Sequence, residues 1–145
     1  MRGAWTGFSW GHTQAHFYRA ILESVAFEYA YYLGILKDLV PDLQLVEARV
    51  VGGGARGATW NQIKADVLGV PYQRLKRSEF GTWGCALIAA KAVGLVDDLA
   101  EAAGRATQLD GAPFTPRAEV HTINQPLAAN YIHLQEVLSH LSDEK

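Results

Sequence analysis

The chain has 145 residues, of which 49% are hydrophobic and 19% are charged. These proportions exclude a disordered or collagen-like polymer and indicate one globular domain or a piece of a larger one. With 13 Lys and Arg residues against 15 Asp and Glu residues, the net charge is -2, so neither nucleic acid nor an anionic membrane surface is expected as a partner.

The single cysteine, Cys85, cannot form an internal disulfide or a zinc cluster. We therefore expect a reducing, cytoplasmic environment, in which Cys85 is packed inside the protein. The most apolar stretch, residues 20–40, is interrupted by four charged residues, so no membrane span is expected. Residues 1–11 lack the apolar core of a signal peptide and are interpreted as the N-terminal loop of a chain cut midway.

The first two elements are a long helix and a short strand. Apolar residues recur at spacings of three and four from Thr13 to about Leu39, which predicts an amphipathic helix with Thr13 as its N-cap and Pro41 beyond its end. Residues 45–51 are rich in β-branched residues and stop at three glycines. This pattern predicts a strand.

Three more helices and one extended stretch follow in the middle of the chain. Residues 58–68 and 82–93 carry apolar side chains at helical spacing, and residues 97–106 predict a short fourth helix. Residues 71–75 alone have extended character between the first two of these helices. Small side chains in residues 82–93 allow close backbone packing of that helix.

The order of helices and strands predicts an α/β fold with short parallel strands and right-handed crossovers. Turn-rich residues 110–116 are expected to separate this body from a tail, residues 117–145, which ends in an amphipathic helix. Two strands do not make a stable sheet, so we expect further strands upstream of Met1. The sheet edge left unpaired predicts self-association into a homo-oligomer.

The strongest local signal is residues 50–57, Val-Val-Gly-Gly-Gly-Ala-Arg-Gly, which run from a predicted strand through glycines into a predicted helix. Glycines let the backbone approach a ligand closely, and a helix N-terminus favours negative charge. A nucleotide is therefore the natural ligand. A tight corner with no ligand explains the same glycines about equally well.

Gly52, Gly54 and Gly57 also fit G-x-G-x-x-G, the dinucleotide fingerprint, which keeps a dinucleotide-dependent oxidoreductase open as an alternative. That fingerprint requires an acidic residue at the end of the next strand. Three basic residues stand there instead: Arg74, Lys76 and Arg77.

Residues 50–69, VVGGGARGATWNQIKADVLG, together with residues 79–94 and residues 19–27, resemble the C-terminal part of the FGGY carbohydrate kinases, and within that family the xylulokinases most closely. The resemblance covers about residues 3–96 well and the tail loosely. It implies that residues 1–145 form part of a ribonuclease-H-like domain of the actin and sugar-kinase superfamily, on the side that holds adenosine.

The resemblance further implies transfer of the ATP γ-phosphate to a sugar hydroxyl, with D-xylulose as the first substrate to consider and with ATP and Mg²⁺ as cofactors. It places Gly53, Gly54 and Ala55 in the loop beside the adenosine and Ala58 opposite the adenine. The catalytic base lies upstream in this family, so no catalytic residue and no metal ligand is expected here. Ala58 replaces a polar residue of some relatives, and Trp83 replaces a leucine, so packing near the nucleotide could differ.

Two carboxylates and two histidines that could be considered for catalysis or metal binding are interpreted as structural residues instead. Asp66 and Glu23 lie inside predicted helices with no visible perturbing partner, and His12 and His16 share a helix face without a third metal ligand. Six aromatic residues are interpreted as packing rather than as a base-stacking surface: Phe17, Tyr18, Phe27, Tyr29, Tyr31 and Tyr32. A non-catalytic, actin-like nucleotide-binding or assembly module stays open as an alternative to the kinase.

Overall fold

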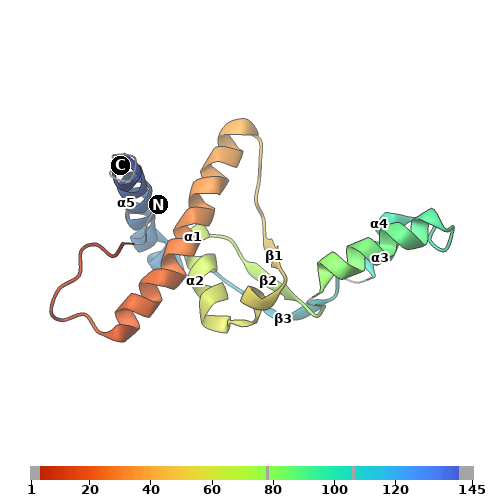
Figure 1. Cartoon of the computed structure of the whole chain (residues 1–145), viewed down its shortest axis with the longest axis horizontal. Coiled ribbons are helices and arrows are strands. Elements are labelled where there is room, and N and C mark those ends of the chain that lie inside the picture. Colours follow the sequence, from red (N-terminus) through yellow and green to blue (C-terminus); the bar gives the residue numbers. More distant parts are fainter. Residues whose placement is uncertain (1–3, 78, 106, 141–145) are drawn as a thin grey trace.

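The computed structural model describes residues 4–77, 79–105 and 107–140. Its elements follow one another along the chain as shown in Figure 1. They are α1 (Gln14–Leu39), β1 (Ala48–Val50), the 3-10 helix η1 (Gly53–Arg56), α2 (Ala58–Leu68), β2 (Tyr72–Leu75), α3 (Phe80–Ala92), α4 (Leu99–Gly104), β3 (Leu109–Phe114) and α5 (Ala118–His140). The α/β class predicted from the sequence is confirmed.

The bounds of α1 follow from residues at its two ends. Thr13 is the extended N-cap, as predicted, and Leu39 is the last helical residue before Pro41. Proline disfavours a helical conformation in the residue before it, and the Val40 N–H instead closes the helix by donating to the Leu36 carbonyl at 2.9 Å. The helix α2 matches its predicted bounds, whereas β1 is shorter than the predicted strand at residues 45–51.

The sheet has the strand order β1-β2-β3. β1 and β2 are parallel, with Ala48 opposite Tyr72 and Val50 opposite Arg74. The crossover between them is α2, which packs on β2. This unit confirms the predicted strand, helix and strand. It also brings the carboxyl ends of β1 and β2 to the same edge of the sheet.

The prediction of a turn-rich separator at residues 110–116 is wrong, because residues 109–114 form β3, antiparallel to β2. Gly111 has a φ of +70° and lies near a register shift between the two strands. Pro113 is tolerated because β3 lies at a sheet edge, and edge strands and bulges are where strands accept proline. The sheet is therefore mixed rather than purely parallel. The expectation of strands upstream of Met1 was based on two predicted strands, whereas the described residues form a sheet of three.

The core lies where α1, α2 and α5 pack together. Ala26 and Phe27 of α1 contact Ile63 and Val67 of α2, and Tyr131 of α5 packs against this cluster. Of the six aromatic residues predicted to be packed, Phe27 is buried and contacts Tyr131 at a ring centroid distance of 5.7 Å. Phe17 is half-buried, and the remaining four, Tyr18, Tyr29, Tyr31 and Tyr32, are exposed, so core packing holds for Phe27 alone. The tail helix thus belongs to the core, and it begins well before the apolar stretch that predicted it.

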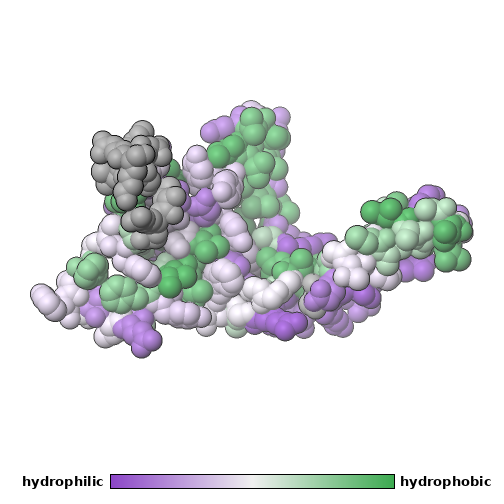
Figure 2. All heavy atoms as spheres, viewed as in Figure 1, coloured by the Kyte–Doolittle hydropathy of each residue, from purple (hydrophilic) through white to green (hydrophobic). Residues whose placement is uncertain are grey.

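α3 and α4 form an arm that projects away from the three-helix core in Figure 1. The two helices contact each other, and Leu87 is buried, but Ile88 and Leu95 are 67% and 80% exposed. Figure 2 shows apolar side chains gathered over this arm. The prediction of a packed Cys85 is wrong, since Cys85 is exposed. Apolar residues occur all around α3, so no amphipathic stripe indicates which face of the helix is packed.

α4 is shorter than the predicted helix at residues 97–106. Asp98 caps it, because its Oδ1 accepts from the backbone N–H groups of Ala100 at 2.8 Å and Glu101 at 3.0 Å. None of the helices within the described ranges has the length and apolar character needed to cross a bilayer.

Candidate functional site

The glycine loop joins the end of β1 to the start of α2, and η1 lies within it. Gly52 has a φ of +82°, a conformation that residues with a side chain rarely adopt. The Ala55 N–H donates to the Gly52 carbonyl at 3.2 Å, and Asn61 Nδ2 donates to the Ala55 carbonyl at 2.6 Å. Because Asn61 is fully buried in α2, this last bond fixes the loop to the helix that follows it.

The four residues predicted to lie beside adenosine differ in how open they are. Ala55 is buried, and both its N–H and its carbonyl bond within the chain. Gly53 and Ala58 are exposed, and a Cβ built on Gly53 meets no heavy atom within 4 Å. Of the four, Gly53 and Ala58 therefore offer the most room to a ligand.

Gly54 has a close neighbour within the chain. A Cβ built on Gly54 would lie 2.9 Å from Cζ3 of Trp60. The Trp60 indole is held on α1, because its Nε1 donates to the Leu22 carbonyl at 3.2 Å, and Lys64 Nζ lies 3.7 Å from a Trp60 ring centroid. Lys64 is only 5% exposed, and burial lowers the pKa of its ammonium group. Packing against Trp60 thus accounts for glycine at position 54 without a ligand.

A hollow of about 260 Å³ lies beside the loop at the carboxyl ends of β1 and β2. The parallel register pairs Val50 with Arg74, which brings the end of β2 next to the glycines. The lining combines Gly52 of the loop with Arg74, Lys76 and Arg77. The basic residues noted at the end of the second predicted strand therefore lie next to the glycine loop.

Trp83, in the first turn of α3, packs on this basic segment. The Arg77 guanidinium carbon lies 4.4 Å from the Trp83 ring centroid. The indole Nε1 of Trp83 is buried and has no hydrogen-bond partner among the described residues. The residue that departs from the family pattern thus contacts the lining of the hollow, which the sequence did not indicate.

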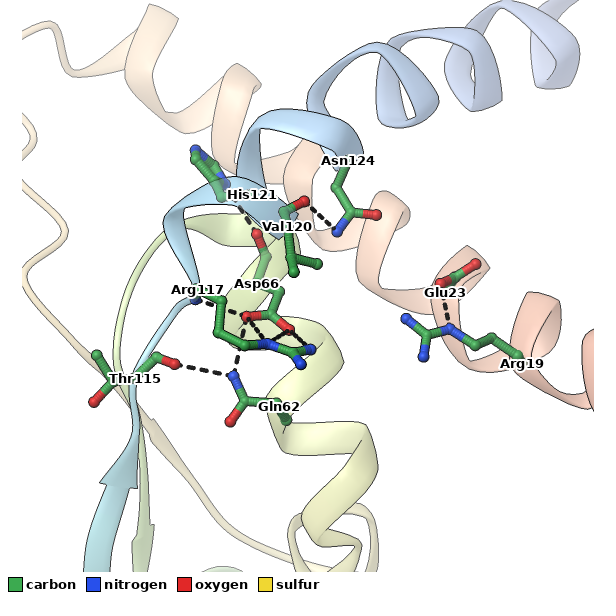
Figure 3. A network of polar contacts seen from close by, with 9 residues as sticks. All are labelled: Arg19, Glu23, Gln62, Asp66, Thr115, Arg117, Val120, His121 and Asn124. Atoms are coloured by element: carbon green, nitrogen blue, oxygen red, sulfur yellow. Dashed lines mark hydrogen bonds and ion pairs between the residues drawn. The ribbon is translucent and has the colours of Figure 1, made fainter.

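Asp66 lies at the centre of a polar network that ties α2 to the start of α5 (Figure 3). It is 1% exposed, accepts from the Arg117 backbone N–H at 2.8 Å, and pairs with the Arg117 guanidinium at 2.5 Å. Burial raises the pKa of the Asp66 carboxyl, but hydrogen bonds from Arg117 and Gln62 outweigh burial and hold that pKa below its ordinary value. The expectation that Asp66 has no perturbing partner is wrong. The interpretation of Asp66 as a structural residue fits these contacts, because its carboxylate bonds to Gln62 and Arg117 of the same chain.

The remaining candidates also have local partners. Glu23 pairs with Arg19 on α1 at 2.6 Å (Figure 3). The rings of His12 and His16 lie 5.2 Å apart, and their Nδ1 atoms accept from the backbone N–H groups of Ser9 and Thr13. Within residues 4–77, 79–105 and 107–140 no three His, Cys, Asp or Glu residues are placed to hold a metal ion.

Comparison with known proteins places this loop and its surroundings in a family. The family described as "FGGY family of carbohydrate kinases, C-terminal domain" matches residues 1–93. The chain is 44% identical over 102 residues to a glycerol kinase of Dechloromonas aromatica (strain RCB), and the match covers 69% of this chain. It is 28% identical over 131 residues to a xylulose kinase of Staphylococcus epidermidis (strain ATCC 35984), and that match covers 90% of this chain.

A solved structure, that of xylulose kinase from Rhodospirillum rubrum, superimposes on 94% of this chain with a TM-score of 0.73 and 28% identity. This similarity confirms the sugar-kinase fold that the sequence resemblance implied. The matched regions cover 20% of the glycerol kinase, 26% of the Staphylococcus xylulose kinase and 27% of the crystallised one, so the chain spans about a quarter of the length of these relatives. The chain belongs to the FGGY family of carbohydrate kinases, and residues 1–93 correspond to the C-terminal domain of that family.

Proposed function

We propose that this chain is the adenosine-side part of the C-terminal domain of an ATP-dependent sugar kinase. The observation that carries the proposal is the open space at Gly53 beside the exposed first residue of α2, Ala58. This space lies at the carboxyl ends of two parallel strands, the edge at which ligands of open α/β sheets bind. Within the domain, residues 1–11 would form an N-terminal loop and residues 117–145 a tail anchored on Asp66.

The residues present fit the adenosine part of ATP. Gly53 leaves room for close approach of a ribose or base, and Ala58 offers a small apolar surface at the N-terminal end of α2. Because Ala58 has no polar side chain, recognition of the base at this position would depend on shape. Gly54 and Ala55 would hold the loop in place through Trp60 and Asn61 rather than through their own contacts with the ligand.

The role proposed for this chain is to bind and orient the nucleotide. Bound ATP would supply the phosphoryl group, and Mg²⁺ would neutralise the charge that moves with it. We assign no catalytic base and no Mg²⁺ ligand to the residues of this chain. The proposed reaction takes place in the cytoplasm, in a protein that contains the remaining parts of a sugar kinase.

The substrate sugar is proposed from the relatives of this chain. D-xylulose is the first substrate to test, because a xylulose kinase matches 90% of this chain. The higher identity to a glycerol kinase over a shorter stretch makes glycerol the second. A panel of pentoses, deoxyhexoses and polyols in a coupled ATPase assay on the full-length parent protein would identify the substrate.

Substitution of Gly53 by valine in the full-length parent protein tests the nucleotide site. A Cβ at position 53 meets no heavy atom of the chain within 4 Å, so we expect the valine side chain to clash with a bound ligand. We expect ATP binding, measured by titration calorimetry, to weaken at least tenfold, a loss of about 1.4 kcal/mol, while sugar binding is retained. Gly34→Val is the matched control, because Gly34 is also exposed and has no neighbour within 4 Å.

Two results would contradict the proposal. ATP affinity that Gly53→Val leaves unchanged would remove the nucleotide from this loop. Tight binding of NADP in preference to ATP would instead support the oxidoreductase alternative, which rests on the pattern of Gly52, Gly54 and Gly57 alone. Packing on Trp60 already accounts for Gly54, so we do not propose that alternative.

A further inference from the structure

Basic residues surround two adjoining hollows between the glycine loop, the end of β2 and the base of the α3–α4 arm. The first hollow, of about 260 Å³, is lined in part by Arg56 and Arg74. The second, of about 370 Å³, is lined by Arg105 and Gln108 together with Lys76 and Arg77. Lys76 and Arg77 line both hollows, so the two form one continuous basic surface.

The charge on this surface is only partly neutralised. Asp110 is the one carboxylate among the residues that line the two hollows, and its Oδ2 lies 3.4 Å from Arg74 Nη2. Arg105 pairs with Glu101 at 2.6 Å. In the part of the chain that the structure describes, neither Arg56 nor Lys76 forms an ion pair. A chain with a net charge of -2 therefore concentrates unneutralised cations at this place.

Arg74 supplies a second sign that a partner belongs here. Its Nε is buried and has no hydrogen-bond partner within the described residues. A buried donor without an acceptor costs free energy, and the rest of the Arg74 side chain, which is 31% exposed, is open to an incoming ligand. The Arg74 side chain is held between Asp110 and the Phe114 ring, whose centroid lies 5.7 Å from the guanidinium carbon.

We propose that the two hollows form a binding site for a ligand that carries two or more phosphate groups. The planar guanidinium group of arginine and the ammonium group of lysine are the side-chain groups that best match phosphate oxygens. Two hollows that share Lys76 and Arg77 suit two linked phosphate groups. The ligand is either a nucleotide, bound through its phosphate chain, or a separate bisphosphorylated metabolite. The existence of the site does not depend on the proposed kinase function.

Inorganic pyrophosphate is the probe, titrated by calorimetry into the full chain at low ionic strength. Lys76→Glu changes an exposed residue of both hollows and is expected to weaken pyrophosphate binding about tenfold or more, as loss of a charge-assisted hydrogen bond does. Lys37→Glu, the matched control, makes the same charge change on an exposed residue of α1 and should alter the affinity less than twofold. Circular dichroism would verify that both variants are folded.

Three results would overturn the proposal. They are no measurable pyrophosphate binding by the unmodified chain, equal weakening by Lys76→Glu and Lys37→Glu, and sulfate binding as tight as that of pyrophosphate. The first result would exclude a binding site for linked phosphates. The second would mean that the overall charge of the chain, rather than this surface, determines the affinity. The third would mean that the surface binds any dianion without selecting linked phosphates.

Competition with ATP and adenosine would identify the source of the phosphates. Displacement of pyrophosphate by ATP but not by adenosine, with ATP binding weakened by Lys76→Glu, assigns the site to a nucleotide. Simultaneous binding of ATP and pyrophosphate assigns it to a separate phosphorylated metabolite. If pyrophosphate binds as expected and ATP does not bind at all, the proposed kinase function fails while this site stands.

Discussion

Replacement of Gly54 by alanine would test the packing of the glycine loop against Trp60. The added Cβ would lie 2.9 Å from Trp60 Cζ3, well inside the optimal carbon–carbon separation of about 3.5–4.0 Å. The ring cannot move away freely, because its Nε1 bonds to Leu22 and Lys64 Nζ lies 3.7 Å from a ring centroid. Overpacking costs about 1–3 kcal/mol, and alanine recovers about 0.4–1 kcal/mol by restricting the unfolded chain. We expect a net loss of about 1–2 kcal/mol.

Urea denaturation followed by far-UV circular dichroism would measure this loss in the free energy of unfolding. Gly53→Ala is the internal control, because a Cβ at position 53 meets no heavy atom within 4 Å. It should be neutral or slightly stabilising. If Gly54→Ala is as stable as Gly53→Ala, the reasoning from Trp60 is refuted.

A double-mutant cycle with Trp60→Phe would separate the clash from other effects of alanine at position 54. Phenylalanine lacks the fused ring that carries Cζ3, so it should relieve most of the crowding. We expect Gly54→Ala to cost less in the Trp60→Phe background by about 1 kcal/mol or more, within the range of coupling energies between residues in contact. Equal costs in both backgrounds would mean that position 54 is restricted by something other than Trp60.

Three further predictions concern the ion pair, the activity and the exposed arm. Asp66→Asn should lower the free energy of unfolding by about 2 kcal/mol at neutral pH. Because the pKa of Asp66 is lowered, its contribution is present above the ordinary carboxyl pKa and is lost as the pH falls through the lowered value, so urea denaturation should show the variant's deficit shrinking in acid. The chain alone should show no sugar kinase activity in a coupled assay with ATP and Mg²⁺, and turnover that survives repurification would contradict this. Light scattering should show self-association that Ile88→Asp reduces, because Ile88 is 67% exposed on the arm; a monomeric unmodified chain would refute it.

Much of the fold could be predicted because local signals and tertiary packing agree in α1, α2 and β2. Gly69 shows this agreement, since it ends α2 with a φ of +69°, the left-handed conformation for which a glycine at a helix end is typical. β3 was missed because Gly111 and Pro113 are also turn residues. Only the pairing of β3 with β2 makes them acceptable in a strand, and that pairing is a long-range property that no local pattern contains.

The candidate site was predicted in outline, and its internal contacts were not. The strand and the glycines located the loop, and the basic residues after β2 were visible in the sequence. Their position beside the loop depends on the parallel register that pairs Val50 with Arg74. The contact of Gly54 with Trp60 depends on the side-chain direction of one helical residue. A pattern of glycines cannot distinguish a glycine that admits a ligand from one that admits a neighbouring ring.

The segment Ala-Asp-Val-Leu-Gly at residues 65–69, which contributes to the family resemblance, contains two residues that contact α5 or Arg117 immediately before it. From the sequence it only helped to indicate a family, whereas in the structure Asp66 holds Arg117 and Gly69 makes room for a ring of α5. A Cβ on Gly69 would lie 2.7 Å from Cε1 of His121, the residue whose Nδ1 lies 2.9 Å from the Asp66 carbonyl oxygen. Both residues therefore serve the docking of α5. The same helix also covers Phe27 through Tyr131, so the tail is part of the structure that holds α2, and through α2 and Asn61 it supports the glycine loop.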